Sequence, residues 1–143
     1  MILPDINLLV NAHNVRAPQH RGASDWWNRC LEGHEGVALP WVVIQGFVRI
    51  TTHPKIFERP MPVGDVLDRV DDWLSLPHVH VILPSQNHFK TWSALLRRLG
   101  TAGNLTTDAH LAALAIERGL VLHTTDADFI RFPGLKWKNP LEN

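Results

Sequence analysis

Short apolar segments alternate with longer amphipathic segments along the chain, and this alternation restricts the possible fold more than any other feature. The short segments resemble buried strands, whereas the longer ones place apolar residues at helical spacing. Strands separated by helices predict an α/β fold, with a mostly parallel central sheet and helices on both faces. We expect strands at residues 2–4, 37–39, 79–83, 120–125 and 135–138, and helices at 6–13, 18–31, 40–50, 63–76, 85–99 and 105–118.

The composition is that of an ordinary globular protein. The 143 residues, 45% hydrophobic and 20% charged, suit one domain spanning residues 1–143. Cys30 is the single cysteine, which excludes an internal disulfide and a cysteine-based zinc site and fits a reducing, cytoplasmic location. The first residues lack the basic region of a signal peptide, and no apolar run reaches the ~18 residues of a membrane span. Because the formal net charge is zero, an RNA ligand would need local positive charge.

Three aspartates far apart in the sequence are predicted to meet at one edge of the sheet. Asp5 follows the first strand and Asp126 follows the fourth, so both belong to the carboxyl edge, where ligands bind in parallel α/β sheets. Asp108 lies in the first turn of the helix that runs antiparallel to the fourth strand, so it belongs to the same edge. Each residue also has an alternative structural role: Asp5 as a helix cap, Asp108 as a partner of the helix dipole, and Asp126 as a turn residue.

The convergence of these carboxylates favours a metal site. Carboxylates in close proximity repel one another unless a cation neutralises them, and hard oxygen ligands suit Mg²⁺ or Mn²⁺. Such a site can activate water for phosphodiester hydrolysis, leaving a 5′-phosphate and a 3′-hydroxyl. The residues that could surround the metal ligands and orient them are Asn7, Thr106, Thr125 and Asp128, with Thr107 and Thr124 also flanking the acids. The alternative for the threonines and Asp128 is that they cap helices and turns. His110 is expected to point away from Asp108, and Cys30 to pack in the core.

Four segments resemble the PIN-domain ribonucleases, in particular the VapC-like toxins of type II toxin–antitoxin pairs. The opening PDINLL resembles the PIN start, with its metal-binding aspartate at Asp5. Residues 103–119, GNLTTDAHLAALAIERG, and 124–140, TTDADFIRFPGLKWKNP, resemble the later motifs, with their acids at Asp108 and Asp126. Residues 47–60, FVRITTHPKIFERP, resemble a loop of one VapC subfamily.

The resemblance implies a PIN-like three-layer sandwich and a metal-dependent endoribonuclease with Asp5, Asp108 and Asp126 as metal ligands. It also implies inhibition by a cognate VapB-like antitoxin, homodimerisation, toxin–antitoxin hetero-oligomers, and a tRNA or rRNA substrate. An antitoxin arginine reaching the acids would block metal binding, and Trp26, Trp27 and Trp73 either line the antitoxin groove or pack in the core. Candidate contacts to the RNA backbone are Arg49, Lys55, Arg59, Arg97, Arg98, Arg131, Lys136 and Lys138.

One position departs from the family pattern. Many PIN domains carry a glutamate where this chain has Gly46, and the neighbouring Gln45 is expected to face another direction. Glu58 and Asp128 are other acids that could contribute. The departure leaves open a degenerate PIN domain that binds RNA or protein without cleavage. A third interpretation is an aspartate-dependent phosphatase or receiver domain, but Asn7 stands where the phosphatase needs a second aspartate, and no suitably placed lysine is found.

Overall fold

The computed structural model describes residues 1–142, which form five strands, six α-helices and two short 3₁₀ helices. The strands are β1 (Ile2–Pro4), β2 (Val37–Pro40), β3 (Val79–Ile82), β4 (Val121–His123) and β5 (Trp137–Lys138). The α-helices are α1 (Ile6–His13), α2 (His20–Glu32), α3 (Trp41–Thr51), α4 (Val63–Leu74), α5 (His88–Leu99) and α6 (Thr106–Arg118). The 3₁₀ helices are η1 (Gly103–Leu105) and η2 (Ala127–Arg131).

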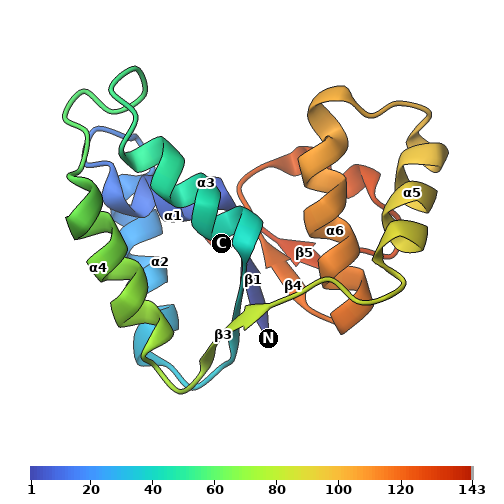
Figure 1. The fold of residues 1–143 in the computed structure, drawn as a ribbon, viewed down its shortest axis with the longest axis horizontal. Coiled ribbons are helices and arrows are strands. Elements are labelled where there is room, and N and C mark those ends of the chain that lie inside the picture. Colours follow the sequence, from blue (N-terminus) through green and yellow to red (C-terminus); the bar gives the residue numbers. More distant parts are fainter. Residues whose placement is uncertain (143) are drawn as a thin grey trace.

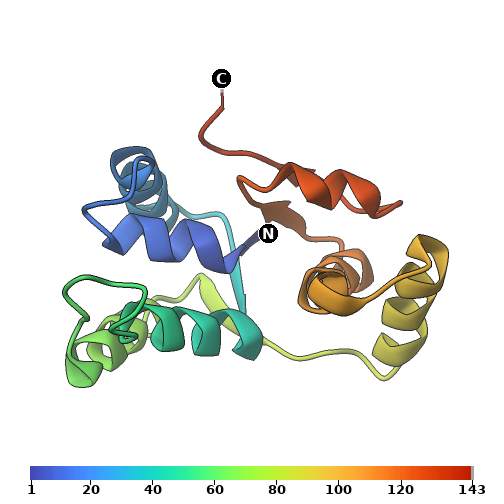
Figure 2. The same cartoon turned by 90° about the horizontal axis from the view of Figure 1, so that it is seen from above.

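The five strands form one sheet in the order β3-β2-β1-β4-β5, and every pairing is parallel. The chain first builds the sheet from β1 towards β3 and then crosses back to β4 and β5. Because parallel crossovers are right-handed, this reversal places α1–α4 on one face and α5 and α6 on the other, as Figures 1 and 2 show. The predicted α/β sandwich with helices on both faces is therefore confirmed, and the strand order reverses between β1 and β4.

The short central strands are enclosed in the hydrophobic core. All residues of β1 and β2 are buried, as expected for parallel strands covered on both faces. The buried alanines of α6 allow the helix to approach the sheet closely. On the opposite side, Trp27 packs edge-on against Trp73, which in turn contacts Phe47. Trp26, Trp27 and Trp73 are all buried in the core, which agrees with the packing alternative, although Trp26 also lines a surface pocket with Arg29 and Glu35.

Several predicted boundaries shift by one to three residues in the structure, and three of these shifts have a visible cause. Strand β4 ends at His123 rather than Thr125, because β1 offers only three paired positions before the chain turns into α1. Pro40 ends β2 and caps α3 rather than lying inside the helix. Helix α5 begins at His88, because the Ser85 hydroxyl accepts a hydrogen bond from the Asn87 N–H in a preceding turn. Among residues 1–142, no helix combines the length and apolarity needed to cross a lipid bilayer.

Candidate active site

The predicted acids lie where the strand order reverses, which is the position at which parallel sheets bind ligands. Asp5 follows β1 directly, and its N–H donates to the His123 carbonyl at the end of β4. Asp108 lies in the first turn of α6, and Asp126 lies three residues beyond β4 as the cap of η2. We call Asp5, Asp108, Asp126 and the neighbouring Asp128 the acidic rim.

Asp5 is buried and held by two hydrogen bonds. As the cap of α1, its Oδ1 accepts from the Ile6 N–H at 2.7 Å, and its Oδ2 accepts from the Thr124 hydroxyl at 2.7 Å. Burial raises the pKa of Asp5, while the bonds from Thr124 and Ile6 oppose that rise. The same Thr124 oxygen accepts from the Asp126 N–H at 3.0 Å, so one buried hydroxyl connects two of the acids. Thr124, rather than Thr125, is therefore the residue that orients Asp5.

The pKa of Asp108 indicates that the acids lie close enough to interact. Its pKa is raised to about 6, first by burial and then by repulsion from Asp5, Asp126 and Asp128. The structure thus brings Asp5, Asp108 and Asp126 close enough to interact, and the predicted neighbour Asp128 also acts on Asp108. Asp126 is partly buried and its Oδ1 accepts from the Asp128 N–H at 2.9 Å, so its predicted turn role is also present.

The remaining predicted residues lie less centrally. Asn7 is exposed, and Thr106 donates to the Gly103 carbonyl at the start of α6. Neither makes a hydrogen bond to an acid within residues 1–142, nor does Thr125. Glu58 pairs with Arg16 at 2.8 Å on the surface.

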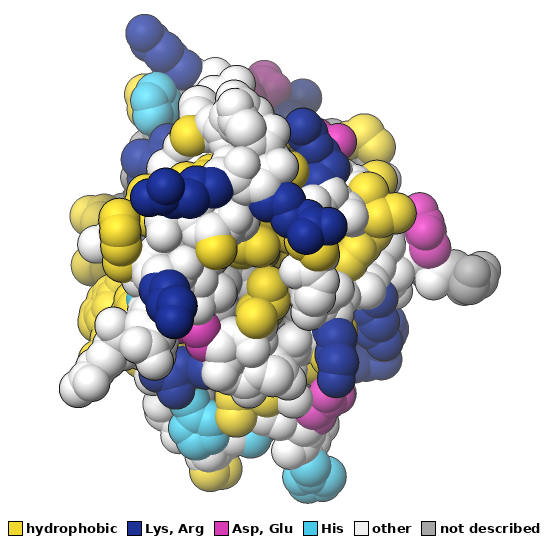
Figure 3. All heavy atoms as spheres, turned by 90° about the vertical axis from the view of Figure 1, so that its right-hand side faces the viewer, with side chains coloured by type: hydrophobic (Ala, Val, Ile, Leu, Met, Phe, Trp, Pro, Cys, Tyr) yellow, Lys and Arg dark blue, Asp and Glu magenta, His cyan; other side chains and the backbone are white. Residues whose placement is uncertain are grey.

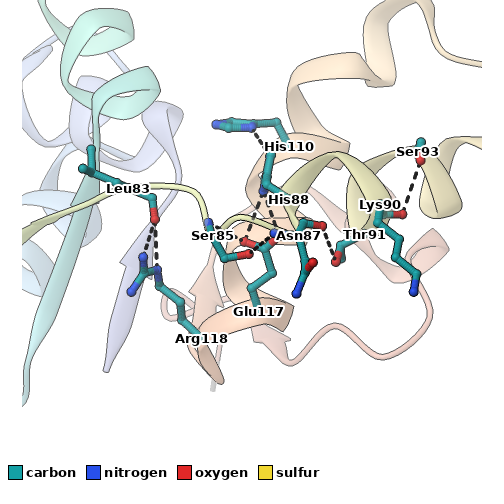
Figure 4. A network of polar contacts seen from close by, with 10 residues as sticks. All are labelled: Leu83, Ser85, Asn87, His88, Lys90, Thr91, Ser93, His110, Glu117 and Arg118. Carbon is teal, nitrogen blue, oxygen red and sulfur yellow. Dashed lines mark hydrogen bonds and ion pairs between the residues drawn. The ribbon is translucent and has the colours of Figure 1, made fainter.

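A polar network between α5 and α6 was not anticipated from the sequence (Figure 4). His88 contacts Glu117 through Nδ1 at 3.0 Å and His110 through Nε2 at 2.8 Å. The His110 side chain contacts His88 of α5 and lines a hollow beside α5. Its seven-residue spacing from Glu117, two helical turns, was the available signal that these residues share a face.

Comparison with known proteins identifies the family. The PIN domain model matches residues 2–135. Ribonuclease VapC33 of Mycobacterium tuberculosis is 43% identical over 99% of both chains, and ribonuclease VapC37 of the same species is 36% identical over 98% of this chain and 97% of its own. The chain belongs to the PIN-domain family, in its VapC ribonuclease branch. This membership rules out the phosphatase and receiver interpretations.

Solved structures support the PIN fold. VapBC-1 from nontypeable Haemophilus influenzae has a TM-score of 0.67 at 16% identity, covering 99% of this chain and all of the other. VapC20 of M. tuberculosis, described as a Sarcin-Ricin loop cleaving toxin, has a TM-score of 0.64 at 15% identity, covering 95% and 99%. At these identities the likeness concerns the fold alone.

The side chain of Ile6 packs against Gly46, the position at which many PIN domains carry a glutamate. A Cβ at Gly46 would lie 2.7 Å from Cδ1 of Ile6, so the Ile6 side chain occupies the space that the family's glutamate would enter. Both residues line a groove together with Gln45 and Arg49 of α3. Gln45 therefore shares the groove with Gly46, contrary to the expected separation.

The donor set of the acidic rim is compatible with a hard divalent cation. Carboxylate oxygens are preferred Mg²⁺ ligands, and the mutual repulsion that raises the pKa of Asp108 is what a bound cation would remove. Among residues 1–142, no three His, Cys, Asp or Glu side chains are already arranged to hold a metal ion directly. A Mg²⁺ ion commonly keeps several waters and takes one or two protein carboxylates, so the rim fits a partly hydrated ion.

Proposed function

We propose that this chain is a magnesium-dependent endoribonuclease that hydrolyses RNA phosphodiester bonds as the toxin of a VapBC-type pair. The observation that carries the proposal is the convergence of Asp5, Asp108 and Asp126 at the point where the strand order reverses, in a chain of the VapC family. Mn²⁺ would serve as an alternative ion, because it accepts the same oxygen ligands.

Each acid has a distinct role in the proposed site. Asp5 and Asp108 hold the cation, with Asp126 as the third ligand, directly or through water. A divalent ion there supplies an activated water and neutralises charge on the scissile phosphate. Thr124 keeps Asp5 in one orientation and favours its charged form, because it donates to the carboxylate. The raised pKa of Asp108 makes its deprotonation a step that accompanies metal binding.

The partner is proposed to be a VapB-like antitoxin. The structural relatives include VapBC2 from Rickettsia felis and a toxin–antitoxin complex from Klebsiella pneumoniae. We expect a homodimer that assembles with this antitoxin, and an antitoxin arginine that reaches the acidic rim to block the metal. A structured RNA such as tRNA or rRNA is the proposed substrate, and VapC20 provides the precedent of a toxin described as cleaving the Sarcin-Ricin loop.

The decisive experiment incubates the purified, antitoxin-free chain with total RNA and Mg²⁺ or Mn²⁺. Discrete fragments should appear and should vanish with EDTA, with Asp5→Asn and with Asp108→Asn. Asp65→Asn is the matched control, because Asp65 also lies in the first turn of a helix but on the exposed surface of α4. Fragments that persist in EDTA or in both rim variants would refute the metal nuclease.

Gly46 supports one alternative, a PIN domain that binds RNA or protein without cutting. The Ile6 side chain fills the space of the missing carboxylate, so the rim has fewer ligands than many family members. RNA that stays intact in every lane but binds the folded chain equally with and without EDTA would favour this alternative.

A further inference from the structure

A hollow of about 440 Å³ lies beside the acidic rim, between α5, the start of α6 and the start of α3. Its walls include Phe89 and Trp92 from α5, His110 from α6 and Val42 from α3. This volume is within the range of roughly 300–1,000 Å³ that is typical of small-molecule sites. The proposed hydrolysis does not involve these residues, so the hollow calls for a separate explanation.

The hollow adjoins the groove that contains Gly46, next to the proposed active site. Val42 and Thr107 line both this hollow and the groove that contains Gly46 and Arg49. Thr107 also directly precedes Asp108 of the rim. A polymer whose phosphate lies at the rim can therefore place an adjacent group in the hollow, past Thr107.

Of the two aromatic side chains of the hollow, Phe89 is exposed, and Trp92 is partly buried and held by a hydrogen bond. Phe89 is 69% exposed, and its ring centroid lies 6.0 Å from that of Trp92. The Trp92 indole N–H donates to the Thr106 carbonyl at 3.1 Å, which fixes its ring against the start of α6. Flat apolar surfaces of this kind are what unpaired nucleobases stack on. Figure 3, which views the molecule from the α5–α6 side, shows Lys and Arg side chains spread around hydrophobic ones with few acids, which suits a polyanion.

His110 supplies one oriented polar group to the hollow. Glu117 can only accept when ionised, so His88 Nδ1 donates to it and the Nε2 of a neutral His88 accepts. His110 Nδ1 is then the donor to His88, and a neutral His110 presents its Nε2 as an acceptor. Figure 4 shows the His110 ring extending away from His88, and within residues 1–142 its Nε2 has no hydrogen bond. An acceptor at this position matches an exocyclic amine.

We propose that this hollow binds one unpaired base of the RNA, stacked on Phe89 and Trp92 and selected by His110 for an exocyclic amine. The inference rests on the proposed function, because it adds a specificity site to the same substrate path. Adenine and cytosine carry such an amine, whereas uracil does not. Bases with the amine should therefore be preferred next to the cleaved bond.

The test measures binding of short fluorescent oligomers of adenosine, cytidine and uridine to the Asp108→Asn chain in EDTA. The adenosine and cytidine oligomers should bind more tightly than the uridine oligomer. Adding Phe89→Ala should weaken binding of all oligomers by at least about fivefold, the lower end of base–aromatic stacking. Adding His110→Phe should remove the preference for adenosine and cytidine but retain binding of uridine. Val15→Ala, at a 78% exposed apolar residue outside the hollow, is the matched control and should change nothing.

Light scattering on the same variants separates this inference from its rivals. Equal binding by all variants, or no base preference in the parent chain, would overturn the base site even if the wild type cleaves RNA. A change from dimer to monomer caused by Phe89→Ala would also overturn it, because the hollow would then be a contact between copies. If the binding pattern is found but the wild type cleaves nothing, the base site stands and the nuclease proposal fails.

Discussion

Replacing Thr124 with valine should show how much the acidic rim depends on one hydroxyl. The side chains are nearly the same size and Thr124 is fully buried, so the change removes hydrogen bonds with little change in packing. One lost bond joins the hydroxyl to the Asp5 carboxylate at 2.7 Å, and the other joins the Asp126 N–H to the hydroxyl at 3.0 Å. A bond to a charged group contributes ~1.5–3 kcal/mol and a neutral one about 1 kcal/mol. The free energy of unfolding should therefore fall by roughly 2–4 kcal/mol at pH 7.

Urea unfolding of Thr124→Val in EDTA measures this loss, and a double-mutant cycle with Asp5→Asn identifies its source. Once Asp5 is neutral, the charge-assisted part of the bond is absent, so Thr124→Val should cost about 1–2 kcal/mol less in that background. The variant should also bind Mg²⁺ more weakly, because Asp5 loses the bond that favours its charged form. An unchanged urea midpoint, or an equal loss in both backgrounds, would refute the argument that Thr124 acts through the Asp5 carboxylate.

Three further predictions concern other parts of the molecule. Burial lowers the pKa of His123 from its ordinary 6.5 to about 4, so the unfolded chain takes up the proton first as the pH falls. The free energy of unfolding should therefore decrease by roughly 2–3 kcal/mol between pH 7 and 4.5, and urea unfolding of His123→Gln should show a smaller decrease. In Gly46→Ala the new methyl group would overlap with Ile6, so this change should not stabilise the chain. In an Ile6→Ala chain the same change should stabilise by up to about 1 kcal/mol through helix propensity, and equal effects in both backgrounds would contradict the close contact. Burial raises the pKa of the Cys30 thiol to about 11, so iodoacetamide should label it at pH 8 only after unfolding, and rapid labelling of the folded chain would contradict its burial.

The sequence predicted the order of elements and the meeting of the acids because both follow from periodicity and from the geometry of parallel sheets. Asp5, Asp108 and Asp126 could be placed at one edge without knowing any side-chain contact. The choice of Thr124 over Thr125 could not be predicted, because it depends on where β4 ends and therefore on its pairing with β1.

The α5–α6 network was missed for a similar reason. The histidine and glutamate on α6 are two turns apart, but His88 comes from another helix, and its approach depends on how α5 packs against α6. The contact between Ile6 and Gly46 likewise joins α1 to α3, so the sequence revealed the missing glutamate without showing what fills its space.

The hydrogen bond between Asp5 and Thr124 also has a consequence for protein synthesis. It joins residues separated by 119 positions, so it cannot form while the ribosome is still making the first four helices. Until β4 is inserted beside β1, Asp5 lacks its orienting hydroxyl, and a chain that ends before β4 also lacks Asp126 and Asp128. A nascent or prematurely terminated chain therefore carries an incomplete acidic rim. Because β4 lies late in the chain, the acidic rim is completed only after residues 121–128 have been made and β4 has joined the sheet.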